Sequence, residues 1–337
     1  MVSSSKVNTM NASTAVATGT AIGIDIGGTK VMSALYNDKQ QVHNLLRVET
    51  PDSADDFIDA IVAMCKKLMA TDGEKPTCIG VSTAGTVDVN RGMILGATGN
   101  VPALQEHTNL KETLEKALGL PVYVENDANA AAYSEMKLGA AKGLRNVVMV
   151  TLGTGVGTGI IVNGKLLHGK NFVAGEGGHI ALDMDRQRLC TCGRWDCWEA
   201  YASGSGLTLT VQQMLRAMPN AKQSRMMQGR DAIVDVTTYD LVEAFREEDV
   251  LAQEIMKVWH RHCGEGIGSL INVLDPEMIV IGGGLAKFVD LDLLKQEVLA
   301  RAMVNDVDLA IAALGGNETG IVGAACLSLE HFSEQSV

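Results

Sequence analysis

Two stretches of this chain share a pattern that restricts its fold: an apolar strand runs into a glycine-rich turn, and a second apolar strand follows. The first is AIGIDIGGTKVMSALYN at residues 21–37, and the second is NVVMVTLGTGVGTGIIVNGKLL at residues 146–167. Alternating apolar residues on both sides of a turn are typical of a β-hairpin. Amphipathic helical patterns follow, over residues 53–69 and most of 206–274. Strand pairs that alternate twice with helices predict an α/β protein of two related lobes.

The glycine turns do not match the common phosphate-binding motifs. Two partial Walker loops, G-x-x-x-x-G-K, have Leu166 and Asn171 where a hydroxyl should bind Mg²⁺. The glycines of residues 153–159 give G-x-G-x-G-x-G before a strand, whereas the dinucleotide fingerprint G-x-G-x-x-G opens a helix. The remaining interpretation is a pair of hairpin tips whose glycines let the main chain approach closely and adopt positive φ, so that backbone N–H groups point at a polyphosphate.

The first tip also carries polar groups suited to a magnesium–phosphate complex. Asp25 offers a carboxylate for Mg²⁺, and Thr29 offers a hydroxyl for phosphate. One glycine hairpin alone is usually only a turn, but a third glycine cluster at residues 282–284 also follows a strand, which favours phosphate binding. The predicted nucleotide-binding residues are Asp25, Gly27, Gly28, Thr29, Lys30, Gly153, Thr154, Gly155, Gly157, Gly283 and Gly284.

Three of the seven cysteines fall within the segment CTCGRWDCWE at residues 190–199. Three thiols cannot pair evenly in disulfides, whereas Zn²⁺ binds four nitrogen or sulfur ligands in a tetrahedron. Cys190, Cys192 and Cys197 would supply three thiolates, and His179 is the closest upstream candidate for the fourth ligand. Four protein ligands leave no position for a reactive water, so the sequence predicts a structural zinc site.

A zinc–thiol redox protein is an alternative interpretation of this segment. Such a protein would carry C-x-x-C, which is missing from residues 190–199, and it would leave both glycine hairpins unexplained. The other four cysteines, at positions 65, 78, 263 and 326, have apolar neighbours, as core residues in a reducing compartment do. We therefore expect a cytoplasmic protein.

The segments DIGGTK, LGTGVGTG, ENDANAAA, GEGGH and CTCGRWDCWE, in this order, resemble the repressor–ORF–kinase (ROK) sugar kinases from about residue 21 to about residue 326. The resemblance implies an α/β, two-lobed actin-like ATPase (ribonuclease H-like) fold with ATP and sugar in the interdomain cleft. We expect a small domain over residues 21–125 plus about 320–337, and a large domain over residues 126–319 that carries the zinc knuckle. Residues 1–20 are polar and are interpreted as a disordered leader.

The resemblance also implies roles for individual residues. Asp127 matches the family's catalytic base, although an aspartate where a strand meets a helix could equally be an ordinary N-cap. At a helix N-terminus its charged form should be favoured. Gly283 and Gly284 would border the adenosine of ATP. The residues that match the family's sugar-binding positions are Asn100, Asn126, Asp127, Glu176, His179 and Glu199.

Two positions depart from the family pattern. Asp196 stands in the cysteine segment where the family has glycine, so the turn there should differ or hold an aspartate in the left-handed region. Gly177 stands in GEGGH where the family has a branched residue. Neither change removes a predicted zinc ligand, but both make the sugar side of the site less typical.

The expected reaction is transfer of the γ-phosphate of ATP, with Mg²⁺, to the 6-hydroxyl of a hexose, most simply glucose. Alternatives in the same family are kinases of N-acetylmannosamine or N-acetylglucosamine. A sugar-responsive transcription regulator is a more remote alternative, because a net charge of −12 offers no electrostatic attraction to DNA. No apolar run approaches the ~18–20 residues that cross a membrane. The family resemblance implies a dimer or tetramer.

Overall fold

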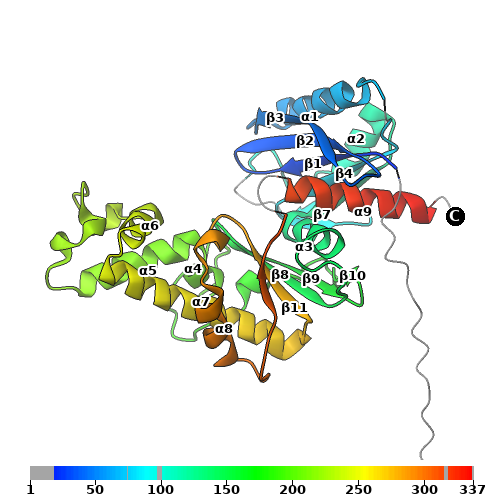
Figure 1. Cartoon of the computed structure of the whole chain (residues 1–337). Helices are drawn as coiled ribbons and strands as arrows, with labels where there is room; N and C mark the ends of the chain where they lie inside the picture. The colour runs from blue at the N-terminus through cyan, green and yellow to red at the C-terminus, as the bar shows by residue number, and fades with distance from the viewer. Residues whose placement is uncertain (1–18, 74, 97–100, 315–317, 336–337) are drawn as a thin grey trace, which may run out of the picture.

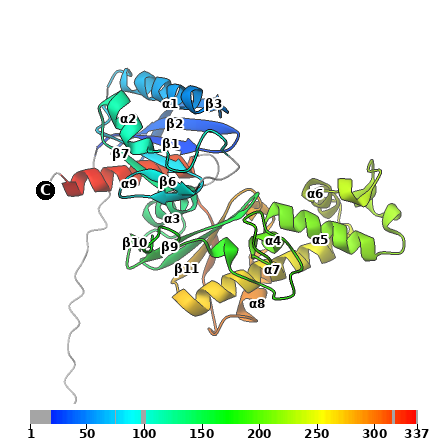
Figure 2. The same cartoon turned by 180° about the vertical axis from the view of Figure 1, so that it is seen from behind.

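Figure 1 shows the computed structural model of the chain, which describes residues 19–73, 75–96, 101–314 and 318–335. Most of the predicted leader and the predicted sugar ligand Asn100 therefore lie outside the described residues. The described chain forms two lobes, with the first lobe (blue and cyan) above the second (green and yellow) in this view. Seen from behind in Figure 2, helices α5 and α6 extend sideways from the second lobe.

Each lobe is built on a five-stranded sheet, and the two sheets have the same construction. In each, an antiparallel hairpin is joined on one side by a third antiparallel strand and on the other by two parallel strands. The first sheet has the order β3 (Val42–Glu49), β2 (Lys30–Tyr36), β1 (Ala21–Ile26), β4 (Cys78–Thr83), β7 (Val122–Asn126). The second has the order β10 (Lys165–Leu166), β9 (Val156–Val162), β8 (Val147–Leu152), β11 (Met278–Gly282), β12 (Leu309–Ile311). The prediction of two related α/β lobes is confirmed.

The remaining elements cover these sheets. The helices are α1 (Ala54–Met69), α2 (Leu110–Leu118), α3 (Asp127–Lys137), α4 (Glu199–Ala202), α5 (Gly204–Ala217), α6 (Thr238–Arg246), α7 (Val250–Leu274), α8 (Leu291–Leu299) and α9 (Thr319–Gln335). A small hairpin joins β5 (Thr86–Asp88) to β6 (Met93–Gly96). Single 3₁₀ turns occur at η1 (Gly177–His179), η2 (Ala221–Gln223), η3 (Arg225–Met227), η4 (Ile233–Asp235) and η5 (Ala286–Phe288).

Local sequence signals explain where the first-lobe helices begin and end. Ser53 accepts a hydrogen bond from the backbone N–H of Asp56 and caps α1. Asn109 caps α2 in the same way, and Gly119 ends that helix in the left-handed conformation with φ of 70°. Helix α2 thus begins after its capping asparagine and stops at its glycine.

Helices α3 and α9 lie between the lobes. Each follows the last strand of one sheet in the chain but packs on the sheet of the other lobe. α3 follows β7 of the first sheet but packs on β8 and β9 of the second. α9 follows β12 of the second sheet but packs on β1 and β4 of the first. The two helices also pack against each other, so both connections between the lobes pass through one layer (Figure 1).

Glycines allow this middle layer to be tight. A Cβ on Gly80 of β4 would lie 1.9 Å from the carbonyl oxygen of Ala324 on α9. A Cβ on Gly323 would lie 2.0 Å from the carbonyl oxygen of Ala130 on α3. Any side chain at either position would push a helix off its neighbour.

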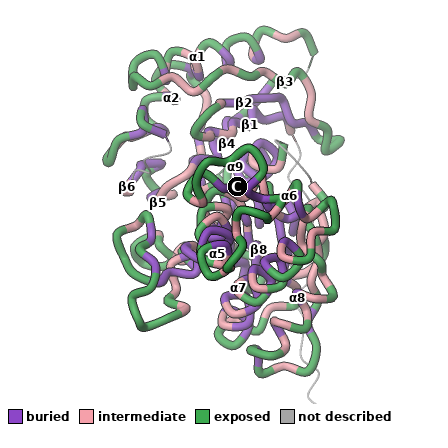
Figure 3. The backbone as a smooth tube through the Cα atoms, turned by 90° about the vertical axis from the view of Figure 1, so that its left-hand side faces the viewer, coloured by how far each residue is buried: buried purple, intermediate pink, exposed green. Residues whose placement is uncertain are grey.

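Each lobe has its own aliphatic core, and a third cluster fills the layer between them. The first includes Ile24, Phe57 and Leu114, and the second includes the fully buried Trp198 and Trp259. Figure 3 shows the sheets as mainly buried tube, with exposed segments along the outer helices. The cysteines at 65, 78, 263 and 326 are all buried, as expected of core residues.

The position of α9 supports, as a proposal, the expected division into a small domain (21–125 with about 320–337) and a large domain (126–319). β7 ends at Asn126, and α3, which packs on the second sheet, begins at the next residue. Among the described residues, none of the helices combines the length and the apolar character that a membrane crossing requires.

Candidate active site

Asp25 lies near the end of β1, where β4 and the start of α9 approach its carboxylate. Ser82 of β4 donates a hydrogen bond from Oγ to Asp25 Oδ1 at 3.0 Å. Gly320, at the start of α9, approaches so closely that a Cβ there would lie 2.3 Å from the same oxygen. Burial raises the pKa of Asp25, while the Ser82 hydrogen bond and the charge of Lys30 act in the opposite direction. A bound cation would stabilise the ionised form, so this carboxylate suits the magnesium role predicted for it.

The hairpin tips differ from the sequence-based expectation in their backbone conformation. Both are closed by main-chain bonds, from Gly27 N to Lys30 O and from Gly153 N to Gly155 O, each 3.0 Å long. Among the predicted phosphate-binding glycines, all of which the structure describes, Gly283 alone has a positive φ, of 86°. The expectation of left-handed tips is therefore wrong for Gly27, Gly28, Gly153, Gly155 and Gly157.

Close approach explains the glycines of the second tip instead. A Cβ on Gly155 would lie 2.4 Å from Glu199 Oε2, and a Cβ on Gly157 would lie 2.6 Å from Thr151 Oγ1. A Cβ on Gly283 would lie 2.4 Å from the carbonyl oxygen of Leu152, directly before Gly153. The structure thus brings Gly283 against the second tip.

The start of α5 also meets this tip, which sequence reasoning missed. Gly204 N donates to Gly153 O at 2.8 Å, and Ser205 Oγ donates to Thr154 O at 3.4 Å. The run of alternating glycine and serine at residues 203–206 was the signal for this contact.

Asn126, and not Asp127, is the N-cap of α3. Asn126 Oδ1 accepts the backbone N–H groups of Ala128 and Asn129 at 2.9 and 3.2 Å, and its Nδ2 donates to the carbonyl of Gly85 at 3.1 Å. Asp127 occupies the first helical position, with Oδ1 accepting the N–H of Ala128 at 2.8 Å. The ordinary capping role that the sequence left open for Asp127 is therefore filled by its neighbour.

The Asp127 carboxyl has an unusual electrostatic environment. Its side chain is open to solvent, yet protein surrounds it so closely that desolvation raises its pKa to about 6. The negative charge of Asp25 and, more weakly, that of Glu176 add to this shift, and backbone hydrogen bonds oppose it. The helix N-terminus therefore does not lower this pKa, because desolvation and like charges outweigh it, but at about 6 the carboxyl is still mainly ionised at neutral pH. Asp127 lies where residues of both lobes converge.

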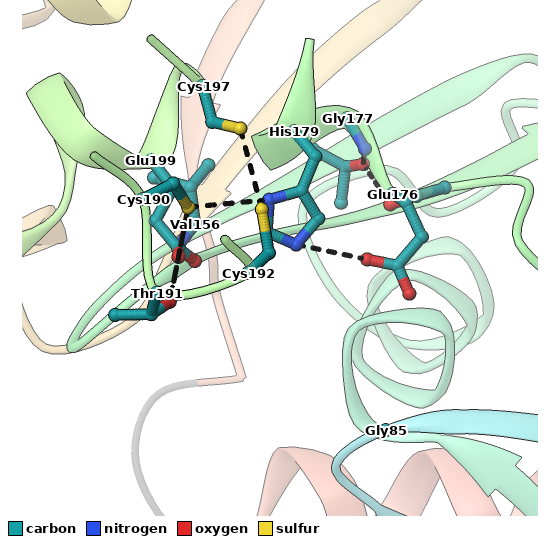
Figure 4. Close-up of polar contacts among 12 residues, drawn as sticks. Gly85, Val156, Glu176, Gly177, His179, Cys190, Thr191, Cys192, Cys197 and Glu199 are labelled. Atoms are coloured by element: carbon teal, nitrogen blue, oxygen red, sulfur yellow. Dashed lines mark hydrogen bonds and ion pairs between the residues drawn. The ribbon is translucent and has the colours of Figure 1, made fainter. Parts of the chain in front are cut away.

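Glu176 and His179 lie on one loop of the second lobe, close to the cysteine cluster (Figure 4). The Glu176 side chain is 44% exposed, and its Oε2 lies 3.8 Å from His179 Nε2. The other ring nitrogen of His179, Nδ1, faces Cys190 Sγ at 3.8 Å. His179 therefore stands between the predicted sugar-binding carboxylate and the predicted metal ligands.

The four predicted zinc ligands come together. One donor atom from each of His179, Cys190, Cys192 and Cys197 lies within 4.8 Å of the others, and the sulfurs of Cys192 and Cys197 are 3.6 Å apart. Tetrahedral zinc with Zn–S bonds of about 2.3 Å places its sulfurs about 3.8 Å apart. The donor set and its spacing therefore fit a tetrahedral metal ion.

Asp196 shapes the turn of the cysteine segment. Its φ of 56° confirms a left-handed aspartate where the family pattern has glycine. Its carboxylate accepts the N–H groups of Gln187 and Arg188 and the hydroxyl of Tyr201, at 3.1, 2.7 and 2.8 Å. The departure from glycine thus adds hydrogen bonds that hold the segment together.

Glu199 has a different environment from Glu176. Its Oε2 accepts the backbone N–H of Val156 at 3.1 Å, and its Oε1 accepts the hydroxyl of Thr191 at 2.9 Å and faces Cys190 Sγ at 3.3 Å (Figure 4). In this conformation Glu199 ties the cysteine segment to the second hairpin tip. A sugar-binding role for Glu199 stays a prediction, as do those of Asn126, Glu176 and His179.

Comparison with known proteins shows which family has these features. The model of the ROK family matches residues 21–331. Glucokinase from Streptomyces coelicolor is 37% identical over 317 residues, which cover 93% of this chain and 98% of the relative. N-acetyl-D-glucosamine kinase from Pasteurella multocida is 33% identical, with 91% and 98% covered. A crystal structure of a ROK family glucokinase from Streptomyces griseus, in complex with glucose and AMPPNP, is 34% identical, with a TM-score of 0.75 and 93% and 100% covered.

The chain therefore belongs to the ROK family. Its fold is the two-lobed α/β fold of the actin-like ATPases, which was expected from the sequence motifs and is confirmed.

Proposed function

We propose that this protein is an ATP-dependent hexose kinase that phosphorylates the 6-hydroxyl of glucose. The observation that carries the proposal is the convergence on Asp127 of charge from Asp25 in the first lobe and from Glu176 in the second. The S. coelicolor glucokinase, at 37% identity, and the S. griseus glucokinase with bound glucose and AMPPNP support this substrate pair.

In the proposed reaction, Asp127 accepts the proton of the sugar 6-hydroxyl while that oxygen attacks the γ-phosphorus in line and ADP leaves. With a pKa of about 6, the carboxylate is mainly ionised at neutral pH and is more basic than an ordinary aspartate. Asn126 would orient it, because capping by Asn126 fixes the first turn of α3.

The polyphosphate would lie along the two hairpin tips, on Gly27, Gly28, Thr29 and Lys30 and on Gly153, Thr154, Gly155 and Gly157, with Gly283 and Gly284 beside the adenosine. Asp25 would hold Mg²⁺, which supplies charge neutralisation to the phosphates. The Ser82 hydrogen bond keeps the Asp25 carboxylate oriented for this role.

We further infer that His179, Cys190, Cys192 and Cys197 hold a structural Zn²⁺. Their spacing fits a tetrahedral ion, and four protein ligands would leave no open position for catalysis. The ion would join the loop of Glu176 to the cysteine segment, so that Glu176, His179 and Glu199 present fixed groups to the sugar, together with Asn126 and Asn100.

N-acetylglucosamine or N-acetylmannosamine is the second candidate for the acceptor. The 33% identity to the P. multocida N-acetyl-D-glucosamine kinase favours the first of these. We expect the protein to act in the cytoplasm, where its seven cysteines stay out of disulfides, and to form a homo-oligomer.

A phosphate-acceptor screen with Mg²⁺-ATP tests the proposal. Glucose, mannose, fructose, N-acetylglucosamine and N-acetylmannosamine would be compared by kcat/KM in a coupled ADP assay, with ATP alone as the background. The highest kcat/KM is expected for glucose. A preference for an N-acetyl sugar would select the second candidate, and no acceptor-dependent ADP release would refute hexose kinase activity.

A further inference from the structure

The loop of residues 167–179 joins β10 to the end of η1 and carries both Glu176 and His179. Much of its surface is exposed, including Leu167, Lys170 and Val173. A loop with so little burial of its own needs fixed contacts if its polar groups are to meet a ligand in one geometry. Two side chains outside the predicted site supply such contacts.

The first contact attaches the beginning of the loop to β7, the strand that directly precedes the predicted base Asp127. His168 Nε2 lies 2.7 Å from Glu125 Oε2, and Glu125 is only 6% exposed. Glu125 Oε1 in turn accepts the N–H of Asn126 and the Nδ2 of Asn129, both at 2.9 Å. Glu125 therefore connects His168 to the residue that caps the helix of Asp127.

The contact with Glu125 favours the protonated form of His168. Burial alone would lower the pKa of the imidazole, but the hydrogen bond and the negative charge of Glu125 raise it above its usual value. A protonated imidazole opposite a buried carboxylate forms a charge-assisted hydrogen bond, which is stronger than a neutral one.

The second contact holds the end of the loop on either side of Glu176. Thr158 of β9 is 2% exposed, and its hydroxyl donates to the carbonyl of Gly175 and accepts the N–H of Gly177 at 3.0 Å. A Cβ on Gly177 would lie 2.7 Å from Thr158 Oγ1. The glycine that departs from the family pattern is thus the residue that admits this threonine hydroxyl.

We propose that His168 and Thr158 are positioning residues. They hold the 167–179 loop against the end of β7, next to Asp127, and thereby set the affinity for the sugar. This inference rests on the proposed hexose kinase function. Neither residue is assigned a contact with substrate: His168 acts through Glu125, and Thr158 acts through the backbone that flanks Glu176.

The first test is the steady-state kinetics of His168→Gln. Loss of a charge-assisted hydrogen bond should raise the KM for glucose by about tenfold, with kcat and the KM for ATP changed by less than about twofold. Lys165→Gln, which removes a positive charge from the exposed strand before the loop, is the control and should leave all three parameters unchanged. A fall in kcat with an unchanged glucose KM would overturn the proposal for His168.

A double-mutant cycle with Glu125→Gln separates positioning through Glu125 from an independent effect. If His168 acts through this carboxylate, then His168→Gln should have almost no further effect on the glucose KM in the Glu125→Gln background. Independent, multiplicative effects of the two changes would contradict the inferred route.

Thr158 is tested by a matched pair. Thr158→Val keeps the shape but removes the hydroxyl and should raise the KM for glucose by about tenfold, because the N–H of Gly177 loses its partner. Thr158→Ser restores the hydroxyl and should restore the KM to within about twofold of the wild-type value. A wild-type KM in Thr158→Val together with a raised KM in Thr158→Ser would show that the methyl packing matters and not the hydrogen bond.

Amide hydrogen exchange gives a readout that does not depend on activity. Peptides that cover residues 167–179 should exchange at least about tenfold faster in His168→Gln and Thr158→Val than in the wild type, while β8 peptides stay protected. Unchanged exchange would overturn the proposal even in an active kinase. Faster exchange in a protein without hexose kinase activity would refute the proposed function and leave the clamping of the loop intact.

Discussion

The chain passes between the lobes at two junctions, β7–α3 and β12–α9. The strands β7 and β12 occupy equivalent edge positions in their two sheets. At the first junction the strand ends at Asn126 and the helix begins at Asp127, with no residue between them. At the second, residues 312–318 separate β12 from α9.

The polar groups at the two junctions do different work. The first junction presents the Asp127 carboxyl, whose pKa is raised to about 6. The second is fastened by Glu135 of α3, a fully buried residue whose carboxylate accepts the N–H groups of Ala313 and Leu314 at 3.0 and 2.8 Å, and also that of Ala140 at 2.7 Å. The repeated framework therefore creates two similar positions with different side chains: the first presents the proposed base, and the second ties α3 to the segment before α9.

Of the changes at the two junctions, Asp127→Asn should have the largest effect, and that effect should be on kcat. Removal of the proposed base should lower kcat by about 10³-fold, within the usual range for general-base catalysis, while the affinity for ATP stays nearly unchanged. Single-turnover kinetics and equilibrium nucleotide binding would measure the two quantities. Turnover close to that of the wild type would show that the first junction does not supply the base.

Glu135→Gln should give the opposite result at the second junction. An amide nitrogen in place of one carboxylate oxygen would face a backbone donor, at a cost of about 2–4 kcal/mol in the free energy of unfolding. Urea denaturation would measure this loss, and the kcat of the folded fraction should stay within about twofold of the wild type. A stable variant with a greatly reduced kcat would break the division of roles between the junctions.

Cys192→Ser should destabilise the second lobe alone. Loss of one ligand should remove the proposed zinc and lower the midpoint of thermal unfolding by about 5 °C or more, because structural metal binding is coupled to folding. Metal analysis and calorimetry of this variant, with the buried core Cys263→Ser as a control that keeps its metal, would check this. No stoichiometric zinc in the purified wild-type protein would refute the metal site.

The pH dependence of kcat/KM for glucose is the smallest expected effect and the one most specific to Asp127. The Asp127 base must be ionised, so kcat/KM for glucose should fall about tenfold for each pH unit below an apparent pKa of about 6. An acid limb near pH 4 would contradict the raised pKa of Asp127.

The same pKa predicts that stability changes with pH in the opposite direction to activity. Because the folded-state pKa of about 6 lies above the ordinary aspartate pKa of 3.8, the ionised carboxylate opposes folding at neutral pH, and stability is gained as the pH falls from 6 towards 4. Asp127→Asn should therefore be more stable than the wild type above pH 6, and this advantage should vanish below about pH 4. Denaturation curves at several pH values would measure the difference.

Much of the fold was determined by short-range sequence signals. Ser53, Asn109 and Gly119 set helix ends through bonds to neighbours a few residues away, and the repeated hairpins specified two related sheets. The clustering of the four residues proposed to bind zinc could also be predicted, because three of them lie within eight positions and a tetrahedral ion needs only one more ligand. These features depend on local geometry, which sequence spacing records.

Only the tertiary structure decided how the site groups act. The pKa of Asp127 depends on Asp25 and Glu176, roughly a hundred and fifty residues apart in the chain, and desolvation has no sequence signature. The same holds for Glu199, which meets the backbone of Val156, and for His168, which meets Glu125. Coulomb energies depend on the distance between charges, and hydrogen bonds need a donor and an acceptor about 3 Å apart, so both follow distances in space that the order of residues does not contain.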